Sequence, residues 1–351
     1  MTQTLDWADV MTRVPRERFI PDVIWRHDRE RAGNDLVPVD RRTDPAVWEA
    51  MVAADGPVIT QVDNGHPTDD GMGVEATSSC SDRDVVREML ELLAPVAGER
   101  VLEIGTGTGW NAALLDAAGV NVTSVEIDPE LARQARARLI ENGCRGVVVL
   151  NADGATVKLG ELDAVIATVG TTAIPWAWVM QTRIGGRLVV PLNGSWYPPG
   201  LAVLERTQDE ATGRLAGPAD FMRMRSQARS RAVPLPVDLA PAHTSTTTVH
   251  PYFLTGDRDA AVAIDQQTSG IRFTWRSPDD SAEGVLWIYG SDSWATIDAT
   301  TGVPYAVEQA GPRQLVDEVL GAYRWWQDHG EPAVSDWRVT VTPDEQTIQQ
   351  R

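Results

Sequence analysis

An apolar stretch that ends in a carboxylate and runs into three glycines constrains the fold of this chain most. Residues 101–109 read Val-Leu-Glu-Ile-Gly-Thr-Gly-Thr-Gly, and a helix-compatible stretch, 111–118, follows. Glycine lets the backbone turn sharply between a strand and a helix and lets a ligand approach the main chain closely. A second strand-like stretch, 122–127, carries Glu126, whose carboxylate is suited to accept hydrogen bonds from ribose hydroxyls. The pattern therefore predicts a strand, turn and helix that bind a nucleoside.

The details of the turn favour S-adenosylmethionine over other nucleoside cofactors. The turn opens Glu-x-Gly-x-Gly-x-Gly, whereas dinucleotide-binding turns read Gly-x-Gly-x-x-Gly and phosphate-binding loops end in Lys-Ser or Lys-Thr. The next predicted strand ends in an acidic residue, and Asp153-Gly154 follow a third strand, where they could recognise adenine. The expected cofactor-binding residues are Glu103, Gly105, Thr106, Gly107, Thr108, Gly109, Asn111, Glu126, Ile127, Asp153 and Gly154.

Each of these features also has a purely structural interpretation. The glycine turn could only pack a helix against a strand, and Asp153-Gly154 could be a turn at a strand end. Trp110 and Asn111 could only cap and pack the helix whose N-terminal amides would face the methionine end of the cofactor. Cofactor binding is the favoured interpretation, because the glycine turn and Glu126 are separated in sequence as a nucleoside-binding strand, turn and acidic strand end require.

Strands and helices alternate through the middle of the chain, which predicts a parallel sheet covered by helices on both faces. Residues 1–80 are expected to be irregular apart from a short helix at 7–13, because Asp, Gly and Pro interrupt them. After them we predict helices at 84–93, 111–118, 130–142 and 176–181, and strands at 100–104, 122–127, 147–150, 162–168, 187–191 and 201–206.

The pattern changes in the last third of the chain. Residues 233–251 are rich in Pro, Ser and Thr, as in a linker or a long ordered loop. Alternating stretches at 271–275 and 285–289 predict a hairpin, 314–328 an amphipathic helix, and 337–341 a last strand. The expected parts are an N-terminal segment (1–80), a Rossmann-like S-adenosylmethionine-binding domain (81–225), and a linker with a smaller α+β domain (226–351).

The charge balance excludes two classes of partner. The 351 residues contain 31 Lys and Arg against 50 Asp and Glu, which gives a net charge of −19. Such a surface repels nucleic acid and anionic membranes, so we expect neither as a partner. The two cysteines and five histidines form no metal-ligand pattern, so no metal is expected. Few cysteines, a polar N-terminus and the lack of a long apolar stretch predict a cytoplasmic protein.

Several motifs, taken in order, resemble those of the protein-L-isoaspartate O-methyltransferases. The resemblance covers roughly residues 10–205 and implies the Rossmann-like sheet of a class I methyltransferase that uses S-adenosylmethionine. The motifs are Val-Pro-Arg-Glu-Arg-Phe-Ile-Pro at 14–21, the glycine turn at 101–109, Ser-Val-Glu-Ile-Asp-Pro-Glu-Leu-Ala at 124–132, Asp153-Gly154, Ile174-Pro175, Gln181, and Gly-Gly-Arg-Leu-Val-Val-Pro at 185–191.

Two departures from that family narrow the expected substrate. The family's substrate motif reads Thr-x-Ser-Gln-Pro, whereas residues 77–83 read Thr-Ser-Ser-Cys-Ser-Asp-Arg, so Asp82-Arg83 replace Gln-Pro. The chain also continues beyond the Rossmann unit, and 323–326 and 339–343 resemble an actinobacterial subgroup that accompanies lanthipeptides and graspetides. This resemblance implies methylation of one aspartate side chain in a cyclised precursor peptide, after which the ester forms an aspartimide.

Three other functions stay open at this point. The first alternative is an isoaspartate repair methyltransferase acting on damaged proteins. The second is a scaffold that binds the cofactor without catalysis, and the third is a methyltransferase for small carboxylic acids. The subgroup resemblance further implies that 1–80 face the substrate and that 226–351 recognise the precursor peptide; no oligomeric state is predicted.

The hydroxyl-rich stretch 77–81 is the expected acceptor side. Ser79 and Ser81 are the expected catalytic residues, because a hydroxyl orients a carboxylate without neutralising it, and Ser81 could also cap the following helix. A carboxylate is already ionised at neutral pH, so no general base is expected. Cys80 has no histidine in sequence reach, which favours a buried, neutral thiol. The expected substrate-binding residues are Thr77, Ser78, Arg83, Arg223 and Arg225.

The stretch 221–225, continued by Arg229 and Arg231, is the densest basic run of the chain. Such a run is either a solvated face or, in a chain of net charge −19, a place that holds an acidic peptide. Tryptophans are also numerous in the tail. For them, packing inside a small domain is favoured over a platform that binds the peptide.

Overall fold

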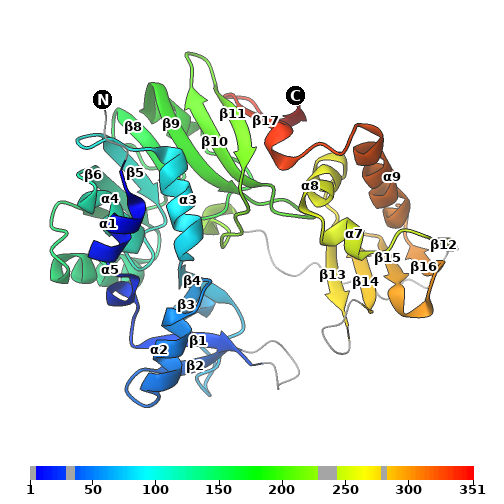
Figure 1. Ribbon diagram of the computed structural model, residues 1–351, viewed down its shortest axis with the longest axis horizontal. Coiled ribbons are helices and arrows are strands. Elements are labelled where there is room, and N and C mark those ends of the chain that lie inside the picture. The colour runs from blue at the N-terminus through cyan, green and yellow to red at the C-terminus, as the bar shows by residue number, and fades with distance from the viewer. Residues whose placement is uncertain (1–4, 29–35, 228–242, 278–282) are drawn as a thin grey trace.

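The computed structural model describes residues 5–28, 36–227, 243–277 and 283–351. They form a four-stranded sheet near the N-terminus, a nine-stranded central sheet and a five-stranded sheet in the C-terminal part. Figure 1 shows the N-terminal sheet below the central sheet and the five-stranded sheet beside it on the right. Among the described residues, no helix is long and apolar enough to cross a membrane.

The central sheet confirms the predicted α/β fold. Its order is β18-β17-β11-β10-β9-β8-β5-β6-β7, in which β5 to β9 run parallel and β10 and β11 continue antiparallel. The chain moves outward from β5 to β7 and then returns to β8 on the other side of β5, and ligands bind at the carboxyl ends of strands where the order reverses in this way. The strands are β5 (Arg100–Ile104), β6 (Asn121–Glu126), β7 (Val148–Asn151), β8 (Leu162–Ala167), β9 (Thr182–Leu192), β10 (Gly200–Arg206) and β11 (Ala211–Ala216).

The helices around this sheet lie where the sequence pattern places them, within a few residues. Pro129 is the first residue of α5, as expected, and the Asp128 carboxylate caps that helix by accepting from two backbone N–H groups. Asp, Pro and the acidic first turn together make a strong helix start. The helices are α1 (Trp7–Arg13), α3 (Arg83–Leu93), α4 (Trp110–Ala117), α5 (Pro129–Glu141) and α6 (Trp176–Gln181).

The N-terminal segment is not irregular, and that expectation was wrong. It forms an antiparallel sheet of order β2-β1-β3-β4, with the helix α2 (Pro45–Ala53) between β2 and β3 in sequence. The strands are only five residues long, and β4 reads Ala-Thr-Ser-Ser-Cys. Pairing with neighbouring strands, rather than an apolar alternation, therefore defines them. They are β1 (Val23–His27), β2 (Leu36–Asp40), β3 (Val58–Val62) and β4 (Ala76–Cys80).

Residues 243–336, here called the C-terminal lobe, confirm the smaller α+β unit. The expected hairpin is present, since β13 pairs antiparallel with β14, and the expected amphipathic helix is α9. Of the expected linker, 233–242 lie outside the described residues, and the rest holds β12 and ends just before α7. The elements are β12 (His243–Thr247), α7 (Tyr252–Thr255), α8 (Arg258–Gln267), β13 (Arg272–Arg276), β14 (Val285–Tyr289), β15 (Trp294–Asp298), β16 (Tyr305–Ala310) and α9 (Leu315–Asp328).

The end of the chain leaves the C-terminal lobe and returns to the central sheet. The strand β17 (Trp337–Val341) pairs antiparallel with β11, and β18 (Gln346–Gln350) forms the sheet edge. Trp326 of α9 and Trp337 of β17 are buried in the same apolar cluster as residues of β8 to β11. These two tryptophans therefore have a packing role, and Trp326 joins the lobe to the central sheet through this cluster. The last predicted strand is present, but it belongs to the central sheet rather than to the small α+β unit.

Candidate functional site

A cavity of about 380 Å³ opens at the carboxyl ends of β5, β6 and β8, where the strand order reverses. This volume lies within the range of small-molecule sites, roughly 300–1,000 Å³. Its walls come from the central sheet with the glycine turn, from β4 and from residues 220–225. The predicted residues that line it are Gly105, Thr106, Gly107, Thr108, Asn111, Glu126, Ile127, Asp153 and Gly154 on the cofactor side, and Thr77, Ser78, Ser79, Ser81, Arg223 and Arg225 on the acceptor side.

The glycine turn takes a backbone shape that other residues rarely adopt. Gly105, Gly107 and Gly109 all have positive φ, at 94°, 51° and 90°. A Cβ on Gly105 would meet Val169 Cγ1 at 2.6 Å, so only glycine fits there. Gly109 is the N-cap of α4 and offers no side-chain cap, which leaves the first N–H groups of this helix for a ligand.

Glu103 lies behind the turn and does not line the cavity. Its carboxylate is fully buried, accepts from Asn111 Nδ2 at 2.7 Å and also accepts from Ser124 Oγ. Burial raises the pKa of Glu103 to about 7. Gly109 is likewise absent from the cavity wall. Glu103 and Gly109 therefore shape the turn from outside the cavity. Their predicted direct contact with the cofactor is not supported by this geometry.

Asn111 offers an unused acceptor at the cavity wall. Because its Nδ2 donates to Glu103, its Oδ1 is the free end, and that oxygen is buried without a hydrogen-bond partner among the described residues. A buried carbonyl oxygen without a donor is costly, so such an atom at a cavity wall calls for a ligand donor. The ammonium of a methionyl group is a donor of this kind.

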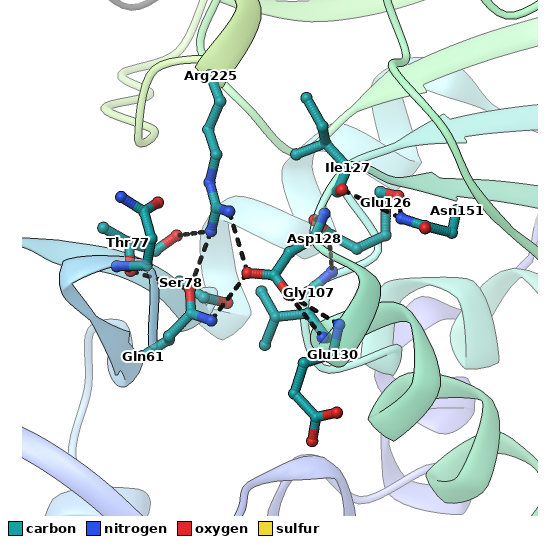
Figure 2. Close-up of polar contacts among 12 residues, drawn as sticks. Gln61, Thr77, Ser78, Gly107, Glu126, Ile127, Asp128, Glu130, Asn151 and Arg225 are labelled. Carbon is teal, nitrogen blue, oxygen red and sulfur yellow. Dashed lines mark hydrogen bonds and ion pairs between the residues drawn. The ribbon is translucent and has the colours of Figure 1, made fainter. Parts of the chain in front are cut away.

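Glu126 stands at the end of β6 with its carboxylate on the cavity wall. Glu126 Oε2 accepts from Gly107 N at 2.9 Å, and Oε1 accepts from Asp128 N at 3.0 Å. Burial raises the pKa of Glu126, and the two backbone N–H groups oppose this shift. Figure 2 shows the contact with Gly107, and it shows the amide of Asn151, which donates to the backbone carbonyl groups of Glu126 and Ile127.

Asp153 and Gly154 form another part of the same wall. Asp153 Oδ1 accepts from Ala155 N at 2.9 Å and so closes a tight turn after β7. A Cβ on Gly154 would meet Ile104 Cγ2 at 2.7 Å, which accounts for glycine at this position. The structural interpretation of this pair as a strand-end turn therefore applies, and contact with adenine stays a prediction.

The strand β4 presents two kinds of hydroxyl. Those of Thr77 and Ser78 are engaged, because Thr77 Oγ1 donates to Gln61 Oε1 at 2.9 Å and Ser78 Oγ accepts from Thr60. The hydroxyls of Ser79 and Ser81, at the cavity wall, have no hydrogen-bond partner among the described residues. Of the four expected acceptor-side hydroxyls at 77–81, these two are therefore free to bind a ligand.

Ser81 does not cap α3, contrary to expectation. The cap is Asp82, whose Oδ1 accepts from Asp84 N at 2.8 Å and from Val85 N at 3.1 Å, and whose Oδ2 accepts from Gly56 N at 2.7 Å. A carboxylate one residue later satisfies more N–H groups than a hydroxyl could. Arg83 does not line the cavity; its guanidinium donates to Val52 O in α2.

Cys80 lies between Ser79 and Ser81 in sequence, but its thiol is fully buried and accepts a hydrogen bond from Thr108 Oγ1 at 3.5 Å. Burial raises the pKa of this thiol, so it stays protonated near neutral pH. The structure agrees with a neutral packing residue rather than a nucleophile.

Two arginines of the basic run, Arg223 and Arg225, lie among the described residues. Arg225 Nη1 donates to Asp128 Oδ2 at 3.0 Å, and Nη2 donates to Gln61 Oε1 at 2.9 Å, as Figure 2 shows. Arg223 also lines the cavity, whereas Arg229 and Arg231 lie outside the described residues. Sequence reasoning missed Gln61 and Asp128, which hold Arg225 at the cavity wall. The Asp-Pro helix start could have indicated Asp128; no local signal marks Gln61.

The residues of this cavity fit S-adenosylmethionine. The carboxylate of Glu126 suits ribose hydroxyls, the uncapped start of α4 suits a carboxylate, and the free Asn111 Oδ1 suits an ammonium. The described residues contain no group of three or more His, Cys, Asp or Glu placed to hold a metal ion. The cavity can thus hold an adenosyl group beside two free hydroxyls.

Comparisons with known proteins point the same way. The family profile described as "Protein-L-isoaspartate(D-aspartate) O-methyltransferase (PCMT)" matches residues 39–222. The chain is 33% identical over 203 residues to protein-L-isoaspartate O-methyltransferase 2 of Marinobacter nauticus, which covers 57% of this chain and 75% of that protein. It is 36% identical over 140 residues to the protein-L-isoaspartate O-methyltransferase of Gloeobacter violaceus, with 39% and 68% covered.

A solved structure of a protein-L-isoaspartate O-methyltransferase has a similar fold. It aligns with a TM-score of 0.52 at 16% identity and covers 99% of this chain and 95% of the solved one. The similarity of fold therefore extends through the C-terminal lobe as well as the central sheet.

Proposed function

The chain belongs to the protein-L-isoaspartate O-methyltransferase family, and from this premise we propose that it methylates an aspartate side chain of a cyclised ribosomal peptide. It is an S-adenosylmethionine-dependent carboxyl O-methyltransferase of the α/β class. One observation carries the proposed acceptor side. The glycine turn lies against β4, where a Cβ on Gly107 would be 3.6 Å from Ser79 O, so the free hydroxyls of Ser79 and Ser81 lie beside the cofactor turn.

For methyl transfer to a carboxylate, the protein mainly has to position the two reactants. The bound cofactor supplies an electrophilic methyl group, and the acceptor carboxylate, with a pKa near ~4, is ionised at neutral pH without a base. The hydroxyls of Ser79 and Ser81 can donate to one carboxylate oxygen and leave the other free to react. Alignment of this kind supplies on the order of 7–11 kcal/mol of the barrier.

The ester then reacts within the peptide itself. The backbone nitrogen that follows the methylated residue attacks the ester carbonyl and forms a C–N bond, and the methoxy group leaves with the amide proton as methanol. The product is a five-membered imide. This step uses only atoms of the substrate, so the protein needs no further group for it.

The residues at two positions support a substrate other than damaged protein. The positions that carry Gln-Pro in the family hold Asp82, which caps α3, and Arg83, which donates to α2, so both have structural roles here.

Isoaspartate repair is the second candidate, and a specific observation favours it. The relatives reported above are named protein-L-isoaspartate O-methyltransferases, and the solved one aligns with nearly the whole chain, the lobe included. The lobe by itself therefore does not distinguish repair from peptide tailoring.

Labelled S-adenosylmethionine separates the two candidates. The protein is incubated with an isoaspartyl peptide, a side-chain-cyclised graspetide-type peptide and the linear form of that peptide as a control. We expect label to be transferred to the cyclised peptide only and then released as labelled methanol. Mass spectrometry should show a methyl gain on aspartate followed by loss of methanol. Label in the isoaspartyl peptide alone would establish repair instead.

A further inference from the structure

One face of the N-terminal sheet begins at the acceptor side of the cofactor cavity. Ser79 of β4 lies opposite Ile59 of β3 in the antiparallel register, and both residues line the cavity. Ile59 also lies opposite Trp25 of β1, and Trp25 lies opposite Pro38 of β2. Residues directly opposite each other in antiparallel strands project from the same face of a sheet. These four residues, here called the cross-strand row, therefore lead from the cavity across all four strands.

The two faces of this sheet differ in burial. The opposite face carries Ile24 and Cys80, which are buried in the apolar core beneath the sheet. On the face of the cross-strand row, Ile59 and Trp25 are half-buried and Pro38 is exposed. Neither Ile59 nor Trp25 belongs to an apolar cluster formed by the described residues. The row is therefore an apolar strip on the surface that continues the wall of the cavity.

Trp25 differs from the tryptophans that have a clear packing role. Trp48, Trp110 and Trp178 are buried, and Nε1 of each donates to a backbone carbonyl group. Trp25 Nε1 donates to none of the described residues. Neither a core contact nor a hydrogen bond thus accounts for an indole at this position. A large ring on the surface beside an acceptor site offers contact area to an apolar side chain of a substrate.

The spacing of the cross-strand row suits a short stretch of peptide. Neighbouring strands lie roughly 4.8 Å apart, so Trp25, two strands away from Ser79, is about 10 Å from it. A peptide in the polyproline II conformation advances about 3.1 Å per residue and presents every third side chain on the same side. The third residue from an acceptor held at Ser79 therefore reaches Trp25 with its side chain facing the sheet.

We propose that the cross-strand row binds the substrate segment next to the acceptor, and that Trp25 contacts an apolar or aromatic side chain three residues from the methylated one. Ile59 packs against the residues between these two positions. The proposal rests on the proposed function, since it places the acceptor carboxylate at Ser79 and Ser81. Their hydroxyls contact only the acceptor itself, so the row would add selectivity for the sequence around it.

Peptide binding tests this proposal without catalysis. Anisotropy of fluorescein-labelled peptides is recorded with the full chain and saturating S-adenosylhomocysteine, on a side-chain-cyclised scaffold with one free aspartate and on a linear scaffold with one isoaspartate. The third residue before or after the acceptor is phenylalanine or serine. In the more tightly bound scaffold, phenylalanine on one side of the acceptor should strengthen binding about tenfold. Trp25→Ala should remove this preference and Trp25→Phe should keep most of it. Tyr252→Ala, which removes an exposed aromatic ring of the C-terminal lobe, is the control and should keep it fully.

Three results would overturn the proposal: equal affinities of the phenylalanine and serine peptides in the wild type, no binding of any peptide, or the same preference in Trp25→Ala and Tyr252→Ala. Trp25→Thr keeps a strand-forming residue and, with a thermal melt of each variant, separates a lost contact from lost folding. Methyl transfer is scored separately with labelled cofactor. Label in the isoaspartyl peptide alone, with the preference present, would refute the proposed function and leave the row standing. Label in the cyclised peptide without the preference would do the reverse.

Discussion

The guanidinium of Arg225 and the carboxylate of Asp128 meet beside the cofactor cavity, with 3.0 Å between Nη1 and Oδ2. Asp128 also caps α5 through Oδ1, so one side chain serves two partners. Arg225 continues to Gln61 Oε1 at 2.9 Å in β3. This contact ties the segment after β11 and the N-terminal sheet to the turn that follows Glu126.

This pair should be worth more than an ion pair on the surface. We expect a double-mutant cycle of Arg225→Met and Asp128→Asn, which keeps the cap, to give a coupling of about 1 kcal/mol in the free energy of unfolding, because the Asp128 side chain is 8% exposed. Urea denaturation measures it. The exposed pair Arg133 and Glu130 should give about 0.3 kcal/mol. Equal coupling energies for the two pairs would show that the Arg225–Asp128 contact stabilises the fold no more than a surface ion pair does.

Glu126→Ala should weaken S-adenosylmethionine binding by about 10–100-fold, since charge-assisted hydrogen bonds contribute roughly 1.5–3 kcal/mol. The substitution removes the acceptor of Gly107 N as well as the expected acceptor of the ribose. Isothermal titration calorimetry gives the dissociation constant. Glu130→Ala, four residues on and exposed, should bind like the wild type. Wild-type affinity in Glu126→Ala would remove the cofactor assignment.

Ser81→Ala should lower kcat for methyl transfer by about 100-fold and leave cofactor affinity unchanged, because it removes a donor aimed at the acceptor and nothing on the cofactor side. Ser79→Ala should act in the same direction. Single-turnover assays with labelled cofactor measure the rate, and Ser245→Ala, on the exposed face of β12, is the control. Unchanged turnover in both cavity variants would place the acceptor elsewhere.

The buried carboxyl of Glu103 should make stability depend on pH. Its pKa is raised to about 7 in the folded state by burial, against 4.5 unperturbed, so the folded chain keeps a proton that the unfolded chain loses in this window. Its contribution to the free energy of unfolding is therefore full below pH 4.5 and is lost as pH rises through 7.

Glu103→Gln carries no titrating group, which makes it the test. Between pH 5 and 8 the wild type should lose about 2 kcal/mol relative to this variant, by urea denaturation at each pH. Glu141→Gln, exposed at the end of α5, should follow the wild type. Parallel curves for Glu103→Gln and wild type would mean that Glu103 is ionised throughout.

Local patterns in the sequence were sufficient for the central unit. The glycine turn needs positive φ at three positions, and the apolar strands and capped helices around it are marked by residues close in sequence. Because these signals are local, the parallel sheet, the cofactor cavity and the place of Glu126 could all be predicted. The hydroxyls at Ser79 and Ser81 were identified by their motif alone.

Contacts between segments distant in sequence determined the N-terminal sheet, the edge of the central sheet and the contacts of Arg225. The strand β4 has no apolar alternation and exists because β3 pairs with it, and Asp82 caps α3 partly because Gly56 N is nearby. The return of β17 to β11 and the meeting of Arg225 with Asp128 join residues that no local pattern relates. Pairing of strand edges and burial of charged groups depend on what packs opposite them, so only the tertiary structure determines these contacts.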